Sequence, residues 1–195
     1  LFSIFLLLLK NLSFAEDFYF EGDDIEIINN GEILKSNKGI KVTSSSGVVI
    51  TAQEFEYNKN NFELTVNKNV IVDDKVNNLI IKTNKIKYLK DIEQIQTFED
   101  TEIEIEKNII IITKDLIYSK NLNEIYSKNK TIVKDKYKNS FITNDFVLNT
   151  SNKILKAKDV KLKDSDGNIS YFKSFFSNIE KNEFYGKDIK MNFSN

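Results

Sequence analysis

The residue types that most often perform chemistry are missing from this chain. Its 195 residues include neither His nor Cys. The commonest general base, the commonest transition-metal ligand and the thiolate nucleophile are therefore all absent. Carboxylates, Lys and Ser can also support catalysis, but no pair of carboxylates stands out as one that would flank a substrate. We therefore expect no enzyme, no catalytic residue, no metal site and no cofactor.

The densest group of oxygen ligands is the segment DSDGN at residues 164–168. A calcium-binding loop places more oxygen ligands at fixed spacing and ends in a bidentate Glu. Asp-Gly is instead a strong signal for a hairpin turn. We interpret the segment as a turn, and we expect the pairs Asp73-Asp74 and Glu99-Asp100 to be solvated residues at strand ends.

The charge balance gives no sign of a nucleic-acid partner. Lys and Arg together number 28 against 29 Asp and Glu, which gives a net charge of -1, and every cation is a Lys. Proteins that bind nucleic acids usually have a net basic surface and use the guanidinium fork of Arg. We expect no nucleic acid among the partners.

Residues 1–15 have the pattern of a secretory signal peptide. An apolar run from Leu1 to Leu9 is followed by Ser13-Phe14-Ala15, which offers small residues where a signal peptidase cleaves. The run is too short for a bilayer core, which takes roughly twenty residues. We predict a mature chain that begins near Glu16 and lies outside the cytoplasm, where the lack of Cys is no handicap.

After the predicted cleavage site, apolar and polar residues alternate over short stretches, which is the period of a β-strand. Clear examples are Phe62 to Val66, Glu102 to Glu106 and Val160 to Leu162. Turn signals rich in Asn, Asp and Gly separate these stretches. No amphipathic helix is evident, and the pattern predicts an all-β domain.

A pair of apolar or aromatic residues two positions apart recurs roughly every thirty residues. Each copy is long enough for only a few short strands, which cannot bury an apolar face alone, so the copies must stack on one another. We therefore treat residues 16–195 as one elongated domain. The pairs are Ile25/Ile27, Phe55/Tyr57, Ile86/Tyr88, Leu116/Tyr118 and Phe146/Leu148, with a weaker copy near Phe175.

The strand period also predicts which side chains face inward. These residues could form a closed core, or they could line a slot between splayed sheets. Such a slot could hold acyl chains at about 0.8 kcal/mol per buried CH₂. Lysines such as Lys158 are expected to face outward. The candidate lining residues are Phe55, Tyr57, Phe62, Leu64, Val66, Ile103, Ile105, Leu116, Tyr118, Phe146 and Leu148.

The segment ITAQEFEYNKNNFELTVNKNVIVDD, residues 50–74, resembles the repeating unit of the OstA-like (organic solvent tolerance) family of lipopolysaccharide transport. Lys68 stands where the family usually has Gly, and looser copies cover most of residues 20–195. The pattern is an Ala-Asp-like start, an apolar-x-Tyr pair, a turn, a Leu-containing strand and a G-N-V-x-I strand, here Thr51-Ala52, Phe55-x-Tyr57, Asn58 to Asn61, Leu64 to Val66 and Lys68 to Val72.

This resemblance implies an elongated, open β-jelly roll with two facing, twisted antiparallel sheets. It also implies a non-enzymatic role in the periplasm or at the outer membrane, in which the acyl chains of lipopolysaccharide travel along the apolar groove. Jelly rolls of this family join head to tail through edge strands. The strands around Phe18 to Val42 would accept the periplasmic bridge protein of the pathway.

Within the family, the chain looks most like the N-terminal periplasmic domain of the outer-membrane lipopolysaccharide-assembly protein. We accordingly expect an outer-membrane β-barrel after Asn195, with an outer-membrane lipoprotein as a further partner. The alternatives within the family are the soluble periplasmic bridge protein and an inner-membrane-anchored jelly roll.

A parallel β-helix, acting as an adhesin or a carbohydrate-active scaffold, is the alternative outside the family. Such a fold also repeats every few dozen residues and stacks identical residues in ladders. Thr51, Thr83, Thr113 and Thr143 recur at a suitable spacing. The core of a β-helix would be sealed, whereas a transport jelly roll would admit acyl chains.

Overall fold

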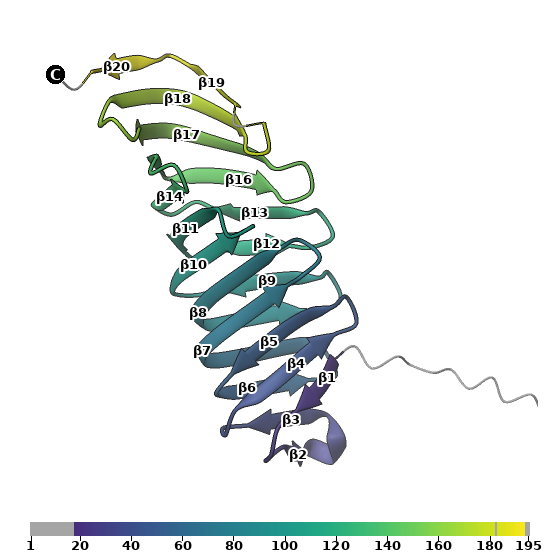
Figure 1. The fold of residues 1–195 in the computed structure, drawn as a ribbon. Helices are drawn as coiled ribbons and strands as arrows, with labels where there is room; N and C mark the ends of the chain where they lie inside the picture. The colour runs from purple at the N-terminus through teal and green to yellow at the C-terminus, as the bar shows by residue number, and fades with distance from the viewer. Residues whose placement is uncertain (1–17, 182, 194–195) are drawn as a thin grey trace, which may run out of the picture.

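The structure is a computed structural model that describes residues 18–181 and 183–193. Over these residues the chain forms an elongated, twisted stack of twenty β-strands with one short 3-10 turn, η1 (Asn29–Gly31) (Figure 1). The strands are β1 (Phe18–Glu21), β2 (Glu26–Ile28), β3 (Ile33–Ser36), β4 (Ile40–Ser44), β5 (Val48–Ala52), β6 (Glu54–Asn58), β7 (Glu63–Asp74), β8 (Leu79–Leu89), β9 (Gln94–Thr97), β10 (Asp100–Ile105), β11 (Ile109–Lys114), β12 (Ile117–Ser119), β13 (Glu124–Ser127), β14 (Thr131–Asp135), β15 (Ser140–Thr143), β16 (Asp145–Asn149), β17 (Ile154–Lys163), β18 (Ile169–Asn178), β19 (Glu183–Lys187) and β20 (Lys190–Asn192).

The strands form one continuous antiparallel sheet that folds over on itself into two facing layers. In layer A the neighbours follow the order β1, β4, β5, β7, β8, β10, β11, β14, β15, β17, β18, β20. In layer B they follow the order β2, β3, β6, β7, β8, β9, β12, β13, β16, β17, β18, β19. The long strands β7, β8, β17 and β18 belong to both layers.

The chain passes between the layers along one side, which we call the seam. At the seam β7 changes register between Asn67 and Val70, and Lys68 and Asn69 have φ of 67° and 52°. This is the geometry of a β-bulge, which bends a strand. Glycine adopts such a φ without a Cβ penalty, which explains why Gly suits the position of Lys68. The opposite side, where the hairpin turns of both layers end, is called the rim.

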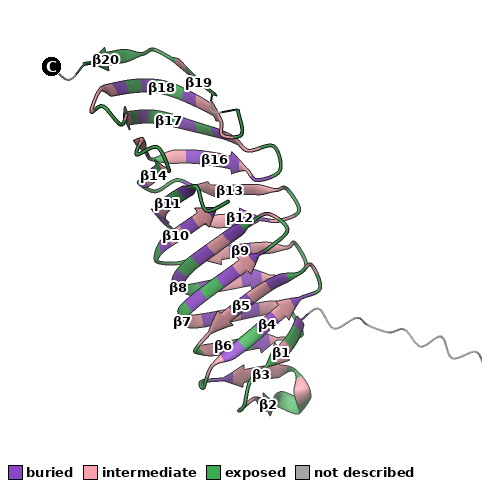
Figure 2. Cartoon of the chain, viewed as in Figure 1, coloured by how far each residue is buried: buried purple, intermediate pink, exposed green. Residues whose placement is uncertain are grey.

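The roughly thirty-residue repeat corresponds to two strands in each layer. Because side chains alternate between the faces of a strand, every second residue points between the layers, and buried and exposed positions alternate along the strands (Figure 2). One inner row crosses layer B from strand to strand, and it contains the second residue of four of the five repeated pairs. The exception is Ile27, which is 66% exposed. This row consists of Tyr57, Leu64, Tyr88, Ile95, Tyr118, Ile125, Leu148 and Leu155.

Aromatic rings fill the space between the layers near both ends of the described stack. Phe18 of layer A packs edge-on against Tyr57 and Tyr88 of layer B, with ring centroids 5.1 and 5.2 Å apart. Near the other end, Phe172 lies against Gly186 so closely that a Cβ on this glycine would fall 2.1 Å from the ring. The layers are therefore held together by packing along their full length.

The sequence prediction of an all-β, antiparallel jelly-roll fold is confirmed. The alternative of a parallel β-helix is wrong for the described residues, because every strand pair among them is antiparallel. The predicted signal peptide at 1–15 lies outside the described residues. In the part of the chain that the structure describes, no helix has the length and apolar character needed to cross a membrane.

Candidate functional site

The interior between the layers contains ten of the eleven predicted lining residues. Each of the ten is at most 5% exposed, and all belong to one hydrophobic core that runs from Phe18 to Phe175. The prediction of their orientation is therefore correct. The ten residues are Phe55, Tyr57, Leu64, Val66, Ile103, Ile105, Leu116, Tyr118, Phe146 and Leu148.

Phe62 is the exception, and the prediction that it faces inward is wrong. It lies in the turn between β6 and β7 with φ of 52°, and its side chain is 44% exposed. Strand alternation starts one residue later, at Glu63, because the turn residues do not follow the strand period. The apolar residue at this position extends the alternating pattern in the sequence without belonging to the strand.

Buried threonines line the seam in a ladder across five neighbouring strands. Thr101 donates a hydrogen bond to Thr97 at 2.8 Å, and the Thr113 and Thr131 hydroxyls are also 2.8 Å apart. These hydroxyls also bond to carbonyls where the chain changes layer, as from Thr101 to Glu99. The ladder therefore provides hydrogen-bond partners for backbone carbonyls where the chain bends from one layer to the other. Its members are Thr83, Thr101, Thr113, Thr131 and Thr143.

The predicted recurrence of Thr51, Thr83, Thr113 and Thr143 is thus only partly a structural ladder. In β5 the inward-facing position that lines up with this ladder is occupied by Ala52, and Thr51 lies one residue before it. Thr101 and Thr131 also belong to the ladder, but they do not occupy the position in the thirty-residue repeat at which the other threonines recur. The ladder runs along an antiparallel fold, so it gives no support to the β-helix.

At the rim, polar side chains connect the turns of the two layers. Asp74, at the end of β7 in layer A, accepts a 2.6 Å hydrogen bond from the Tyr118 hydroxyl of layer B. Asn77 donates to both of them, to Asp74 at 3.0 Å and to Tyr118 at 2.9 Å. The Lys120 ammonium of layer B lies 3.3 Å from the Asp74 carboxylate. Asp74 is fully buried, so the expectation that it is a solvated turn residue is wrong.

A second group of contacts continues this connection toward the N-terminal end. Ser46, in the turn after β4 of layer A, donates to Glu93 of layer B at 2.9 Å. Glu93 also accepts from the Tyr88 hydroxyl and pairs with Lys90. Lys120 donates to the Ser46 carbonyl at 2.8 Å and so joins both groups. We call this network the rim clasp: Ser46, Asp74, Asn77, Tyr88, Glu93, Tyr118 and Lys120.

Beyond the rim clasp, the contacts between the layers become fewer toward the C-terminal end. Lys153 of layer B forms one further ion pair, 3.1 Å long, with Glu106 of layer A. In the next turn of layer A, Asp135 bonds within its own turn, to Tyr137 and Asn139. In the following copies the inner positions of Tyr88 and Tyr118 are occupied by Leu148 and Ser177, which cannot reach across as a phenol does.

Burial and hydrogen bonding oppose one another at the carboxylates of the rim clasp. Burial disfavours the charged form of Asp74, but hydrogen bonds from Tyr118 and Asn77, with the charge of Lys120, outweigh it and hold its pKa below the ordinary value. The pKa of Glu93 is lowered in the same way by Lys90, Tyr88 and Ser46 against the effect of burial. Burial, with the neighbouring carboxylates, raises the pKa of both tyrosines. The clasp is therefore an ionised, hydrogen-bonded network at neutral pH.

The rim clasp was not recognised from the sequence, although a signal exists. Asp74 is followed by Asn at 77 and 78, and Asp135 and Asp164 are each followed by Asn four residues later. In all three turns the Asp caps the backbone of the turn through hydrogen bonds. The DSDGN segment is confirmed as a turn of this kind. Of these three aspartates, only Asp74 also accepts a hydrogen bond from a tyrosine of the other layer. This contact depends on how the two layers face one another, which the sequence does not show.

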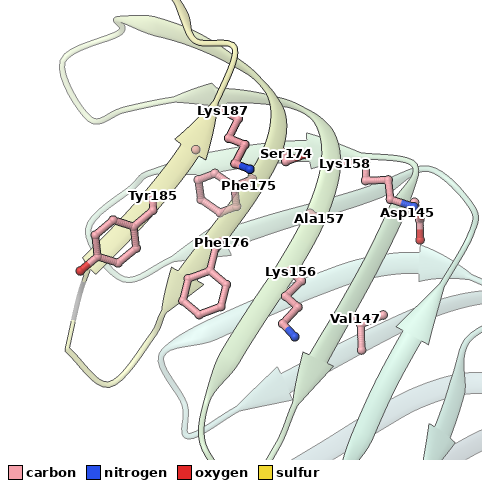
Figure 3. A pocket seen from close by; sticks show the side chains of 11 residues that line it. Asp145, Val147, Lys156, Ala157, Lys158, Ser174, Phe175, Phe176, Tyr185 and Lys187 are labelled. Atoms are coloured by element: carbon pink, nitrogen blue, oxygen red, sulfur yellow. Dashed lines mark hydrogen bonds and ion pairs between the residues drawn. The ribbon is translucent and has the colours of Figure 1, made fainter.

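The outer face of layer B carries a groove of about 570 Å³ near the C-terminal end. Two cross-strand rows of side chains on β16 to β19 form most of it (Figure 3), and Ala157, Phe175 and Gly186 complete its lining. The first row is Val147, Lys156, Phe176 and Tyr185, and the second is Asp145, Lys158, Ser174 and Lys187. Lys158 is exposed here, as predicted.

The described residues hold no group of three or more acidic side chains arranged for a metal ion. They also hold no buried side-chain nitrogen or oxygen without a hydrogen-bond partner. No family model matches the chain, and no curated protein matches it. The features that remain as candidates are the apolar interior, its rim, the strand edges and the outer groove.

Proposed function

We propose that this protein is a non-enzymatic component of lipopolysaccharide transport and assembly at the outer membrane. Its domain lies in the periplasm, and the acyl chains of lipopolysaccharide occupy the space between the two layers while the sugars project from the rim. The observation that carries the proposal is the continuous apolar interior, which extends through every repeat from Phe18 to Phe175. An interior of this length, bounded on one side by turns alone, suits a long apolar cargo.

The rim is the side from which a lipid can enter. The seam is covalently continuous, because β7, β8, β17 and β18 pass through it from one layer to the other. Among the described residues, the contacts across the rim all involve side chains, and they are concentrated in the N-terminal part of the stack. The layers are packed together in the structure, whereas the sequence left open whether they form a closed core or splay apart. Separating them costs buried contacts, which each acyl CH₂ offsets by about 0.8 kcal/mol.

The edge strands support docking to other jelly rolls. Among the described residues, β1 pairs only with β4, and β2 pairs only with β3. An exposed edge of this kind can accept a strand from another protein through main-chain hydrogen bonds. We propose the periplasmic bridge protein as the partner at this edge, and an outer-membrane lipoprotein as a further partner of the assembly protein.

A soluble bridge protein is the second candidate. The other end of the described stack is also unpaired, since β19 and β20 each have β18 as their neighbour and no further strand. Within the described residues, an edge at each end of the stack can pair with a neighbouring jelly roll through main-chain hydrogen bonds. This candidate shares the apolar interior and the cargo, and it differs in whether a barrel belongs to the same protein.

The proposal can be tested by measuring the width of the rim in solution. The chain has no Cys, so paired spin labels can be placed at Lys75 and Leu122, exposed residues in the turns on either side of the rim clasp. Added lipopolysaccharide should lengthen the distance between the labels in pulsed electron paramagnetic resonance. A reference pair at Lys75 and Lys107, both in turns of layer A, should keep its distance.

Two results would contradict the proposal. One is that the purified protein does not bind lipopolysaccharide. The other is that it binds the lipid at saturation while both label pairs keep their distances. In that case the cargo would not lie between the layers.

A further inference from the structure

The outer face of layer B changes character along the stack. One outward-facing row crosses this layer from strand to strand, and in the N-terminal half it is polar: Glu56, Thr65, Lys87 and Gln96. In the C-terminal half the same row becomes mainly apolar: Ile117, Tyr126, Val147, Lys156, Phe176 and Tyr185. Outward positions of a half-buried sheet are normally polar. The apolar half is therefore unusual for a face that meets only water.

The groove lies at the end of this apolar row. The ring of Phe176 stands beside Tyr185, with centroids 6.2 Å apart, and Lys156 separates Phe176 from Val147 (Figure 3). The bend of β17 at Asp159, where φ is 49°, adjoins the second row of the groove. A volume of about 570 Å³ falls within the usual range of roughly 300–1,000 Å³ for small-molecule sites.

The charges around this apolar floor are mainly positive. Lys156 and Lys187 are exposed, and neither forms an ion pair with a described residue. Lys158 is paired with Asp145 at 3.0 Å, and Asp145 is the only acidic residue of the lining. Lysine side chains can lie along an apolar surface and hold their ammonium groups over its margin. The groove therefore combines an apolar floor with two free cations.

We propose that this outer groove binds a single-chain anionic lipid as a monomer. The chain would lie on Val147, Phe176 and Tyr185, and the head group would meet Lys156 and Lys187. The site opens on the outer face of layer B, where Val147 faces outward next to the inward-facing Phe146, and the core residues Ala157 and Phe175 also border it. It differs from the proposed conduit in its location and in taking a lipid from outside the stack.

Dodecyl phosphate, used below its micelle concentration, is a suitable probe. The chain has no Trp, so Tyr185→Trp provides a single fluorescent reporter within the lining of the groove. We expect a saturable blue shift with dodecyl phosphate, a response at least about tenfold weaker with dodecyl maltoside, and none with inorganic phosphate. In the same background, Lys156→Glu with Lys187→Glu should weaken the binding of dodecyl phosphate roughly tenfold or more.

Two controls locate the binding. Lys134→Glu reverses an exposed, unpaired lysine on the outer face of layer A and should leave the affinity unchanged. A separate reporter, Phe146→Trp, faces the interior and distinguishes uptake between the layers from binding outside them. No saturable response of the Tyr185→Trp reporter, equal binding of the maltoside, tight binding of phosphate alone, or no effect of the two groove substitutions would each overturn the proposal.

Discussion

Asp74 is the residue on which the rim contacts depend most. It is fully buried and bonds to Tyr118, Asn77 and Lys120, so it connects three side chains from two layers. From the sequence it could only be interpreted as one of two acidic residues at a strand end. The difference between Asp73, which faces outward, and Asp74, which faces inward, depends on strand register. Its tyrosine partner lies 44 residues away along the chain.

The rim clasp should weaken in acid. Because the pKa of Asp74 is lower in the folded chain than in the unfolded chain, its ionised form stabilises the fold at pH above about 4, the ordinary range for a carboxyl group. This contribution is lost as the pH falls through the folded pKa, and Glu93 acts in the same direction. We predict that the free energy of unfolding declines below pH about 4, as measured by urea denaturation.

Asp74→Asn isolates the contribution of this one carboxylate. At neutral pH this substitution should lower the free energy of unfolding by about 1.5–3 kcal/mol, the usual contribution of a hydrogen bond to a charged group. The decline in acid should also become shallower in this variant. Asp145→Asn is the control, because it removes an acidic residue from an exposed ion pair with Lys158. Such pairs contribute little, so this substitution should change neither the free energy of unfolding at neutral pH nor its decline in acid. An unchanged pH profile in Asp74→Asn would show that the clasp does not depend on this charge.

At the scale of the strands, most of the layout could be predicted. The repeated apolar pairs correctly identify the inner positions of β6, β8, β12 and β16, because the two-residue period of a strand is visible in any single stretch. The sequence does not reveal where one strand crosses between layers. Phe62 was misassigned for a different reason, because it lies in the turn before β7. The long strands β7 and β17 were not expected to serve both layers.

The threonine ladder shows the same limit. Two of its five members, Thr101 and Thr131, occupy a different place in the repeat from the other three. They become neighbours only after strands from successive copies pair in antiparallel register. A side chain that stacks across strands cannot be found from sequence spacing alone when neighbouring strands run in opposite directions.

Removing one hydroxyl of this ladder should destabilise the seam. Thr101 is 1% exposed and bonds to Thr97 and to the Glu99 carbonyl. Thr101→Val keeps the shape of the side chain but removes its hydrogen bonds to the Thr97 hydroxyl and the Glu99 carbonyl, which typically costs about 1 kcal/mol per bond. Thermal and urea denaturation measure the loss. Thr65→Val, on the outer face of layer B, should change the free energy of unfolding by no more than about 0.5 kcal/mol. Equal effects of the two substitutions would contradict the structural role of the ladder.

At the scale of the whole molecule, the two sides of the jelly roll have different roles. The backbone is continuous through the seam, and threonine hydroxyls there form hydrogen bonds with backbone carbonyls. The two layers can therefore pivot about the seam. The rim is held by the clasp over the first copies and has fewer contacts between the layers afterwards. A cargo that opens the rim from the C-terminal part would meet the clasp last. We predict this direction because Leu148 and Ser177 replace Tyr88 and Tyr118 in the later copies.

The outer groove adds a second apolar surface on the outer face of layer B. Val147, Phe176 and Tyr185 of its lining face outward, and Phe175, which also borders it, belongs to the hydrophobic core. Measurements of lipid binding to the whole protein would combine the two sites. Experiments on the conduit therefore need reporters at inward positions and outward controls away from the groove, for which Lys134 is better suited than Lys158.

The most direct test of the conduit is photocrosslinking in cells that export the protein. A benzophenone side chain would replace Phe55, Leu116 or Phe146, one inward position in each of three copies, with Lys134 as the outward control. The account predicts lipopolysaccharide adducts at all three inward positions and none at Lys134. Folded, exported protein with no adduct at any inward position would mean that the interior is a sealed core, and the transport proposal would be wrong.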